Sequence, residues 1–541
     1  MNNSIYNFPI PNNEPILSYL KRSPEREALD NELKRQSSHV IEIPLIIGGK
    51  EIFTGDTAKI VMPHKHSHTL AIYHKAGERE IKMAIDAATS AHKIWSDQNW
   101  TTRASILLKV AELLSTKYRA TINAATMLGQ SKNIYQAEID SACETIDFLR
   151  FNTSFAAEIY KTQPLSAFNQ LNRMEYRALE GFVFSISPFN FTSIASNLNM
   201  APVMMGNTTI WKPASTAVLS NYYLMKVFME AGIPDGVVNF LPGSGSLIGE
   251  HILNSPDLAG IHFTGSNNTF NTLWKEVGEK LTKYKSYPRL VGETGGKDFI
   301  FVHSSAQIRE VAVAAFGGAY EYQGQKCSAA SRMYVPSSLW NEIKKEMTKI
   351  SESVKMGDVR VPENFINAVI DEASFDNIVS YIEYAKASPD AEIVFGGIYD
   401  KSEGYFVSPT FIRTTNPHFK SMEEEIFGPV LTAYVYDDKD IDKAVELCDT
   451  TSPYGLTGAV FGQNRIAVVD ICTKLRYAAG NFYINDKPTG AVVGKQPFGG
   501  SRGSGTNDKA GGEFNLVRWI SPRTIKETFI PATDIFYAYM K

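Results

Sequence analysis

The stretch "GFVFSISPFNFTSIASNLNMAPVMMGNTTIWKP", residues 181–213, contains the alternation that decides the fold. A short apolar run at 181–187 ends before a proline, a helix-compatible segment follows, and a second apolar run at 207–213 ends in Lys-Pro. The alternation continues to residue 284, with further strands expected at 236–243 and 258–266. Strand and helix in turn at this spacing predict a doubly wound parallel sheet, which binds ligands beyond the carboxyl ends of its strands.

The rest of the chain indicates a second unit of the same class. A chain of 541 residues exceeds the size at which one hydrophobic core stops growing, so we expect two or more domains. Residues 78–150 have helical periodicity, and a second alternating stretch runs from about 298 to 500. We expect the boundary near 296–300, beside two glycines. The segments 172–181 and 515–530 have strand character outside both units, and the second is an edge strand suited to pairing with another subunit.

Composition narrows the function classes. The net charge of −4 argues against a nucleic-acid-binding protein, which normally presents a basic face. The four cysteines are far apart and form no C-x-x-C pair, so we expect no disulfide framework, no metal site and a reducing compartment. No run is long and apolar enough to span a membrane. The first 20 residues show neither an apolar signal core nor an Arg-rich transit pattern, and are predicted to form a flexible arm.

One cysteine has an unusual setting. In "EYQGQKCSAASR", residues 321–332, small residues follow Cys327 and leave room around its sulfur. A free cysteine often packs as a small apolar residue, and the alternative is a nucleophile that a substrate must reach. Taken alone, the stretch leaves both interpretations open.

Four further patterns complement a nucleophile. Gly265 and Ser266 in "FTGS" lie between an expected strand and helix, where backbone N–H groups can hold a phosphate, and Lys212 ends another strand. Glu293 in "LVGETGGKD" lies between an apolar strand and two glycines, a setting that suits a general base. Glu425 in "EEIFGPV" can bind ribose hydroxyls. Each of these patterns also has an ordinary structural interpretation, as a turn, a helix cap or a solvated lysine. The glycine loop at 242–249 departs from the dinucleotide-binding pattern.

Jointly these groups fit the oxidation of an aldehyde. A thiolate adds to the aldehyde, the oxyanion collapses by giving hydride to a nicotinamide, and the remaining thioester needs a base and a water. Three alternatives remain. A cysteine hydrolase needs a histidine partner, and none of the ten histidines stands out. An enzyme that passes its thioester to coenzyme A does not need the base, and a non-catalytic scaffold needs none of these groups.

The motifs "GQKCSAASR", "LVGETGGK", "SPFNF", "WKP", "FTGS", "EEIFGPV" and "PFGGSRGSGTNDKAGG" together resemble the aldehyde dehydrogenase superfamily, from about residue 14 to the C-terminus. The resemblance implies an α/β fold with two doubly wound, Rossmann-like domains and a β-hairpin oligomerisation arm, assembled as a homodimer or higher homo-oligomer. It implies an N-terminal arm at 1–40, an NAD-binding domain at 41–297 with the hairpin at about 165–181, a catalytic domain at 298–514, and a C-terminal oligomerisation strand and tail at 515–541.

The resemblance also implies roles for individual residues. Cys327 is the nucleophile, its backbone N–H and the Asn190 amide form the oxyanion hole, and Glu293 activates the deacylating water. Lys212 and Glu425 hold the two riboses of NAD, and Phe427 supports the nicotinamide. Further cofactor contacts fall on Ser187, Gly265, Ser266, Asn267, Asn268 and Thr269. In family members that prefer NAD, an acidic residue often lies three positions after the lysine of "WKP". Ser215 occupies that position here, which weakens the expected preference for NAD over NADP.

The motifs "NFYINDK", "VVGKQPFGG" and "SGTNDK" are similar to the branch of the family that oxidises glutamate γ-semialdehyde in proline breakdown. The resemblance implies that the loop "PTGAVVG", residues 488–494 and here called the anchor loop, grips the α-carboxylate through the backbone N–H groups of Gly490 and Ala491. Many relatives have Ser where Ala491 stands. Ser328 is the second carboxylate partner, and Phe191 and Phe498 wall the aliphatic chain. The branch is located in the mitochondrial matrix in eukaryotes; the N-terminus leaves the cytosol open. The alternative is another semialdehyde or an aliphatic aldehyde as substrate.

Overall fold

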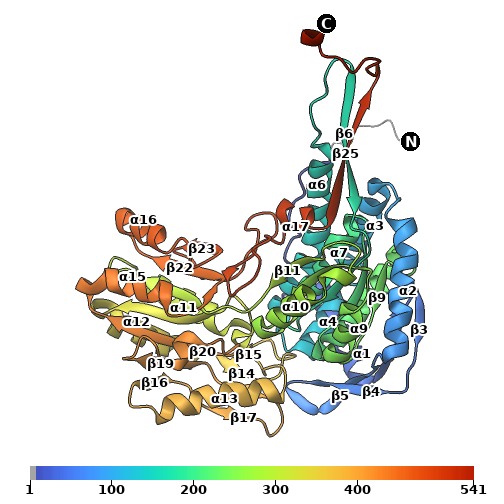
Figure 1. The fold of residues 1–541 in the computed structure, drawn as a ribbon. Coiled ribbons are helices and arrows are strands. Elements are labelled where there is room, and N and C mark those ends of the chain that lie inside the picture. Colours follow the sequence, from blue (N-terminus) through green and yellow to red (C-terminus); the bar gives the residue numbers. More distant parts are fainter. Residues whose placement is uncertain (1–7) are drawn as a thin grey trace.

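The computed structural model describes residues 8–541. Residues 1–7 of the expected N-terminal arm lie outside the described part. Two seven-stranded sheets, each covered by helices, form the two lobes of the molecule, and a two-stranded arm projects away from the first lobe (Figure 1). The two doubly wound sheets that the sequence predicts are thus confirmed.

The first sheet has the strand order β11-β10-β7-β8-β9-β2-β3, in which β7 to β11 are parallel and β2 and β3 complete one edge antiparallel. The chain moves from β7 to one side through β8 and β9, then returns to the other side of β7 with β10. The order of the strands therefore reverses between β7 and β10, where such sheets bind their ligands. The strands are β2 (Leu45–Ile47), β3 (Lys50–Ile52), β7 (Phe182–Ile186), β8 (Thr208–Lys212), β9 (Val238–Phe240), β10 (Leu258–Thr264) and β11 (Arg289–Glu293).

Both faces of this sheet are buried, which explains why its strands are continuous apolar runs in the sequence. Phe182 and Phe184 of β7 pack into one hydrophobic cluster, and Val183 between them packs into the cluster on the opposite face. The helices that cover the two faces are α2 (Glu78–Trp95), α3 (Trp100–Ser115), α4 (Arg119–Gln130), α6 (Glu144–Lys161), α7 (Thr192–Met204), α8 (Val218–Ala231), α9 (Gly245–Leu253) and α10 (Asn267–Glu279). Between α4 and α6 lie α5 (Ile134–Ala137) and a π-helix (Glu138–Cys143).

The second sheet has the order β16-β19-β20-β13-β12-β22-β23, with only β16 antiparallel to its neighbour. Its strands are β12 (Asp298–Val302), β13 (Ala330–Pro336), β16 (Ala391–Phe395), β19 (Thr410–Thr414), β20 (Val430–Tyr436), β22 (Thr457–Phe461) and β23 (Asn481–Ile484). Its main helices are α11 (Ile308–Tyr320), α12 (Ser337–Ser353), α13 (Glu372–Ala387), α15 (Ile441–Thr450) and α16 (Arg465–Lys474). The chain crosses from the first sheet to the second through the segment between β11 and β12, which contains Gly295 and Gly296.

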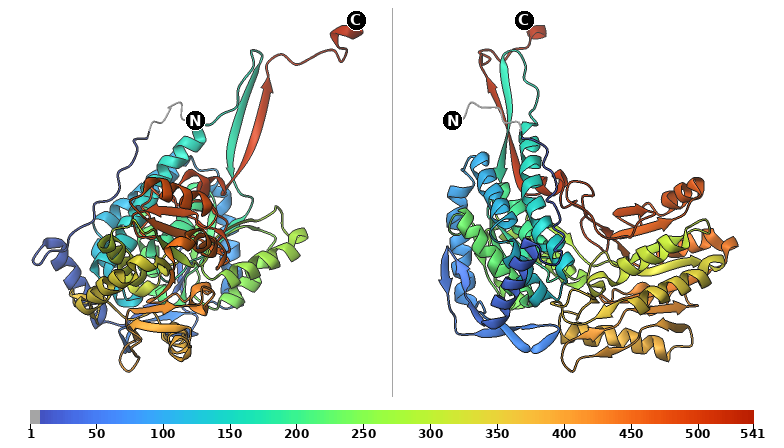
Figure 2. Two further views of the ribbon diagram at one scale, coloured as in Figure 1. Left: turned by 90° about the vertical axis from the view of Figure 1, so that its left-hand side faces the viewer. Right: turned by 180° about the vertical axis from the view of Figure 1, so that it is seen from behind.

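The projecting arm corrects the expectation of a local hairpin at about 165–181. Its strands are β6 (Gln170–Ala178) and β25 (Ile520–Thr528), paired antiparallel over nine residues each in the same chain. The C-terminal strand was expected to pair with another subunit, and in this chain all nine of its residues pair with β6. All views show this ribbon and the C-terminal tail standing clear of the body (Figure 2).

The N-terminal region adds α1 (Pro24–Ser38) and a small sheet of β1 (Ile41–Ile43), β5 (Lys65–His74) and β4 (Thr57–Met62). Among residues 8–541, no helix combines the length and apolar character that crossing a bilayer requires.

Candidate active site

The nucleophile loop, residues 321–327, has a constrained backbone. Tyr322, Gln323 and Gly324 all have positive φ angles, at 55°, 55° and 64°. Such angles are costly for residues with a Cβ and persist only where the surroundings enforce them. Here the Tyr322 hydroxyl donates to the Gln130 carbonyl at 2.9 Å, and the Gln323 amide donates to Ser131 and Ala368 carbonyls. The loop that carries Cys327 is therefore locked against the end of α4.

A cavity of about 470 Å³ brings together most of the predicted reaction and substrate residues. Its lining contains Cys327, Glu293, Phe191, Ser328, Gly490, Ala491 and Phe498. These residues come from both lobes, since Phe191 precedes α7 and Glu293 ends β11 of the first sheet, whereas the anchor loop follows β23 of the second. The substrate cavity thus lies where the lobes meet.

Glu293 is a half-buried carboxylate whose hydrogen-bonding capacity is only partly used. Its Oε2 atom is buried and has no hydrogen-bond partner among the described residues. Burial raises the pKa of Glu293 well above the ordinary value, and the nearby Lys509 opposes this only in part. A carboxylate of raised pKa with an unpaired oxygen facing a cavity can accept a proton from a water there.

Asn190 lies beside the nucleophile loop. Its side-chain amide donates to the Gln325 carbonyl at 3.1 Å, two residues before Cys327. The amide nitrogen carries a second N–H, and no other hydrogen bond of this nitrogen is present among residues 8–541. Asn190 is itself 3% exposed, so the free N–H is presented in a dry environment, where it acts strongly on a developing charge.

The thiol of Cys327 is half-buried and free. Burial, and after it the neighbouring carboxylates, raise the pKa of Cys327 well above its ordinary value. The thiol is therefore the resting form, and forming the nucleophile requires a proton acceptor close by.

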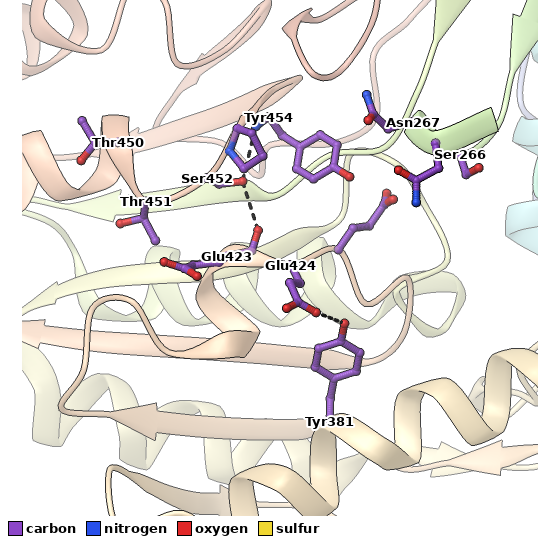
Figure 3. Close-up of a pocket in the computed structure, with 12 residues that line it drawn as sticks. Ser266, Asn267, Tyr381, Glu423, Glu424, Thr450, Thr451, Ser452 and Tyr454 are labelled. Atoms are coloured by element: carbon purple, nitrogen blue, oxygen red, sulfur yellow. Dashed lines mark hydrogen bonds between the residues drawn. The ribbon is translucent and has the colours of Figure 1, made fainter. Parts of the chain in front are cut away.

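A second cavity, of about 720 Å³, lies between the N-terminus of α10 and the second lobe. Ser266, Asn267 and Asn268 line it on one side and Glu425 on the other, with the Tyr454 ring extending toward Ser266 and Asn267 (Figure 3). Ser266 is the N-cap of α10 and accepts from the Thr269 N–H, while the Ser266 and Thr269 hydroxyls lie 2.8 Å apart. The open helix N-terminus suits a phosphate.

Glu425 is held at the cavity by a glycine pair. One carboxylate oxygen accepts from the Gly296 N–H at 3.0 Å, and burial raises the Glu425 pKa to about 7. A Cβ on Gly295 would lie 2.0 Å from the Glu425 carboxylate, and one on Gly296 would lie 2.2 Å from the Cys327 carbonyl oxygen. The absence of side chains at Gly295 and Gly296 therefore allows the Glu425 carboxylate and the nucleophile loop to approach this segment of backbone closely.

The remaining predicted cofactor residues do not line this cavity, and three of them lie at the ends of strands of the first sheet. Lys212 ends β8 and has no carboxylate within ion-pair distance among residues 8–541, and burial lowers its pKa. Ser187 follows β7 and accepts from the Trp211 indole at 2.9 Å, and Gly265 follows β10. Phe427 has φ 57° and its ring meets Phe189 edge-on at 5.7 Å. The chemistry of these groups is complementary to a dinucleotide. Lys212 and Glu425 can bind hydroxyl groups, and the N-terminus of α10 can bind a phosphate.

Several lining residues were missed in the sequence. The Thr489 hydroxyl lies 2.8 Å from that of Ser328, and Glu321 pairs with Lys326 at 2.9 Å and Lys487 at 3.2 Å, all at the substrate cavity. Glu144 lines it too, with a pKa raised to about 8 by burial and then by Asp140. Of these residues, only Lys326 could have been noticed in the sequence, because it directly precedes Cys327. The other residues reach the cavity through tertiary contacts that the sequence does not show. The described residues contain no group of His, Cys, Asp and Glu suited to a metal ion.

Comparison with known proteins places this geometry in one family. Residues 53–525 match the model of the "Aldehyde dehydrogenase family". The "Delta-1-pyrroline-5-carboxylate dehydrogenase, mitochondrial" of Dictyostelium discoideum is 52% identical, covering 99% of this chain and 96% of that protein. The human protein of the same name is 47% identical, covering 98% of this chain and 94% of that protein. The crystal structure of the Mycobacterium tuberculosis Delta-pyrroline-5-carboxylate dehydrogenase bound with NAD superposes with a TM-score of 0.96 at 47% identity, over 100% of both chains.

Proposed function

The chain belongs to the aldehyde dehydrogenase family, and on that premise we propose that it oxidises L-glutamate γ-semialdehyde to L-glutamate with NAD. The semialdehyde is in equilibrium with Δ1-pyrroline-5-carboxylate, the compound in the names of the relatives. The observation that carries the proposal is the single cavity in which Cys327, Glu293 and the anchor loop meet.

The reaction begins at Cys327. Its proton passes to a base and from there to solvent, and the sulfur attacks the aldehyde carbon to form a thiohemiacetal. The free N–H of Asn190 and the Cys327 backbone N–H stabilise the negative oxygen, each contributing roughly 3 kcal/mol by comparison with similar sites. Ser266, Lys212 and Glu425 would hold NAD, which supplies the hydride acceptor when it is bound.

Glu293 completes the turnover. Its unpaired oxygen takes a proton from a water, and the hydroxide attacks the thioester on Cys327. The thiolate leaves, the carboxylic acid is released, and Glu293 returns the proton to the sulfur. A base at this position distinguishes hydrolysis from transfer to coenzyme A.

The far side of the cavity suits an amino-acid head group. Backbone N–H groups of Gly490 and Ala491, the Ser328–Thr489 hydroxyl pair and the nearby Lys326 are complementary to an α-carboxylate. The Glu144 carboxyl group, whose pKa is raised to about 8, can accept a hydrogen bond from an α-ammonium group. Phe191 and Phe498 enclose the methylene groups between the head group and the aldehyde.

The assembly and location follow the same premise. We assign residues 41–297 to the NAD-binding domain and 298–514 to the catalytic domain. The exposed β6–β25 ribbon supports a homodimer or higher homo-oligomer, because an isolated two-stranded ribbon has little stability of its own. The mitochondrial matrix is the proposed location, in keeping with relatives named as mitochondrial.

Formation of NADH from Δ1-pyrroline-5-carboxylate tests the function. We expect a kcat/KM at least roughly 100-fold above that for succinate semialdehyde, which lacks the amino-acid head group. Equal efficiency on both aldehydes would point to a general aldehyde dehydrogenase. Parallel assays with NADP measure how far Ser215, in place of an acid, relaxes the cofactor preference.

A further inference from the structure

Residues 13–19 form what we call the N-terminal strap, a stretch without helix or strand that is nevertheless held firmly. Its backbone is satisfied by side chains of the first lobe. The Glu14 N–H donates to Asp147 at 2.7 Å, the Leu17 N–H donates to Glu138 at 2.9 Å, and the Pro15 carbonyl accepts from Arg119 at 2.8 Å. This contrasts with the flexible arm expected from the composition of this region.

A buried ionic cluster fixes the strap further. Arg119 pairs with Glu14 at 2.5 Å and also with Glu138, whose side chain is completely buried. Arg150 holds the second Glu14 oxygen at 2.6 Å, and the Tyr19 hydroxyl donates to Glu138 at 2.8 Å. Because an unpaired buried charge is costly, the cluster specifies one position for the strap.

The strap reaches the substrate cavity. Asn13, Glu14 and Ile16 line the same cavity as Cys327, at an end where Ile16 is 49% and Tyr135 55% exposed. This is therefore the outer end of the cavity.

Asn13 connects two elements at this opening. Its side-chain amide donates one N–H to the Asp147 carboxylate of α6, at 2.8 Å, and the other to the Val493 carbonyl of the anchor loop, at 2.9 Å. Both amide hydrogens are thus used, one on each lobe. Val493 lies only two and three residues from Ala491 and Gly490, which the proposed function assigns to the α-carboxylate.

We propose that the N-terminal strap forms the outer wall of the substrate entrance and that Asn13 is a positioning residue, which holds the anchor loop in place for the amino-acid head group. This rests on the proposed function. Asn13 acts through the loop backbone, so its loss affects recognition of the head group and leaves the chemistry at Cys327 and the binding of NAD intact.

The test compares Asn13→Ala with Asn12→Ala, a matched control because Asn12 is exposed and makes no side-chain hydrogen bond among the described residues. For Asn13→Ala we expect the KM for glutamate semialdehyde to rise roughly tenfold, because two hydrogen bonds that hold the anchor loop are lost. We expect kcat to change less than about twofold. The KM for NAD and the kcat/KM for a short aliphatic aldehyde stay at the wild-type values, as do all parameters of Asn12→Ala.

An unchanged KM for the semialdehyde, or an equal loss on both aldehydes, overturns the proposal. Hydrogen exchange gives an independent reading: amides of residues 489–493 exchange faster in Asn13→Ala, and unaltered exchange there also counts against it. The wild-type protein is assayed first on both aldehydes. If it shows no preference for the semialdehyde, the proposed function fails; if it shows the preference and Asn13→Ala retains it, only the role of Asn13 fails.

Discussion

The side-chain amide of Asn190 donates to the carbonyl oxygen of Gln325 at 3.1 Å, which ties the start of α7 to the loop that carries the nucleophile. The contact joins the two lobes, because α7 belongs to the first and the nucleophile loop leads into β13 of the second. It leaves the second N–H of the amide without a hydrogen-bond partner among residues 8–541. A single residue thereby contacts the nucleophile loop and, in the proposed function, supplies a donor to the oxyanion.

Asn190→Ala removes that donor. We expect kcat to fall roughly 100- to 1000-fold, as when one oxyanion donor is lost elsewhere, with the dissociation constant of NAD unchanged. Steady-state kinetics and NAD titration measure the two quantities. A loss of less than about threefold would show that the Cys327 backbone N–H suffices alone.

Glu293→Gln separates the two halves of the reaction. The amide cannot take a proton from water, so one equivalent of NADH should form per site before turnover stalls, with a steady-state rate down by roughly 100-fold or more. Stopped-flow measurement of NADH shows the burst. Glu276→Gln, which alters a half-buried ion pair between Glu276 of α10 and Lys280, is the control and should retain normal turnover. An unaltered steady-state rate in Glu293→Gln would refute its assignment as the base.

The pKa of Cys327 is raised by burial and by nearby carboxylates, and this gives a pH dependence of defined sign. Because the thiol is the form present at neutral pH, the fraction of thiolate grows as pH increases toward the raised pKa. We expect the rate of alkylation of Cys327 by iodoacetamide to rise through neutral and alkaline pH without a plateau. Mass spectrometry locates the adduct, and Cys327→Ala supplies the background from the half-buried Cys472. A plateau on the acid side of neutrality would contradict the assigned shift.

The sheets were predictable because their physical signature is local. Strands buried on both faces are apolar throughout, and helices commonly end at a glycine, as α8 does at Gly232 with φ 98°. The start of the same helix was less predictable. Serine and threonine commonly cap helices, yet Ser215–Ala217 form a 3-10 turn and α8 begins without a side-chain cap.

The contacts that could not be predicted join distant parts of the chain. β25 pairs with β6 across some 350 positions, and neither strand alone specifies its partner. The strap has no periodicity, so its place at the cavity depends on Asp147, Glu138 and Arg119, which are ordinary helical residues in the sequence. Thr489 becomes informative only when the fold brings it to Ser328.

Gly295→Ala tests whether the position of Glu425 at the second cavity matters for the binding of NAD. The new Cβ would lie 2.0 Å from a Glu425 carboxylate oxygen, and this flexible side chain would move aside while the backbone stays in place. We expect the KM for NAD to rise roughly tenfold or more, because the displaced carboxylate no longer meets a ribose, with the melting temperature little changed. The matched control is Gly278→Ala on α10, whose Cβ meets no atom within 4 Å and which should bind NAD normally. If both variants bind NAD like the wild type, Glu425 makes no essential contact with the cofactor.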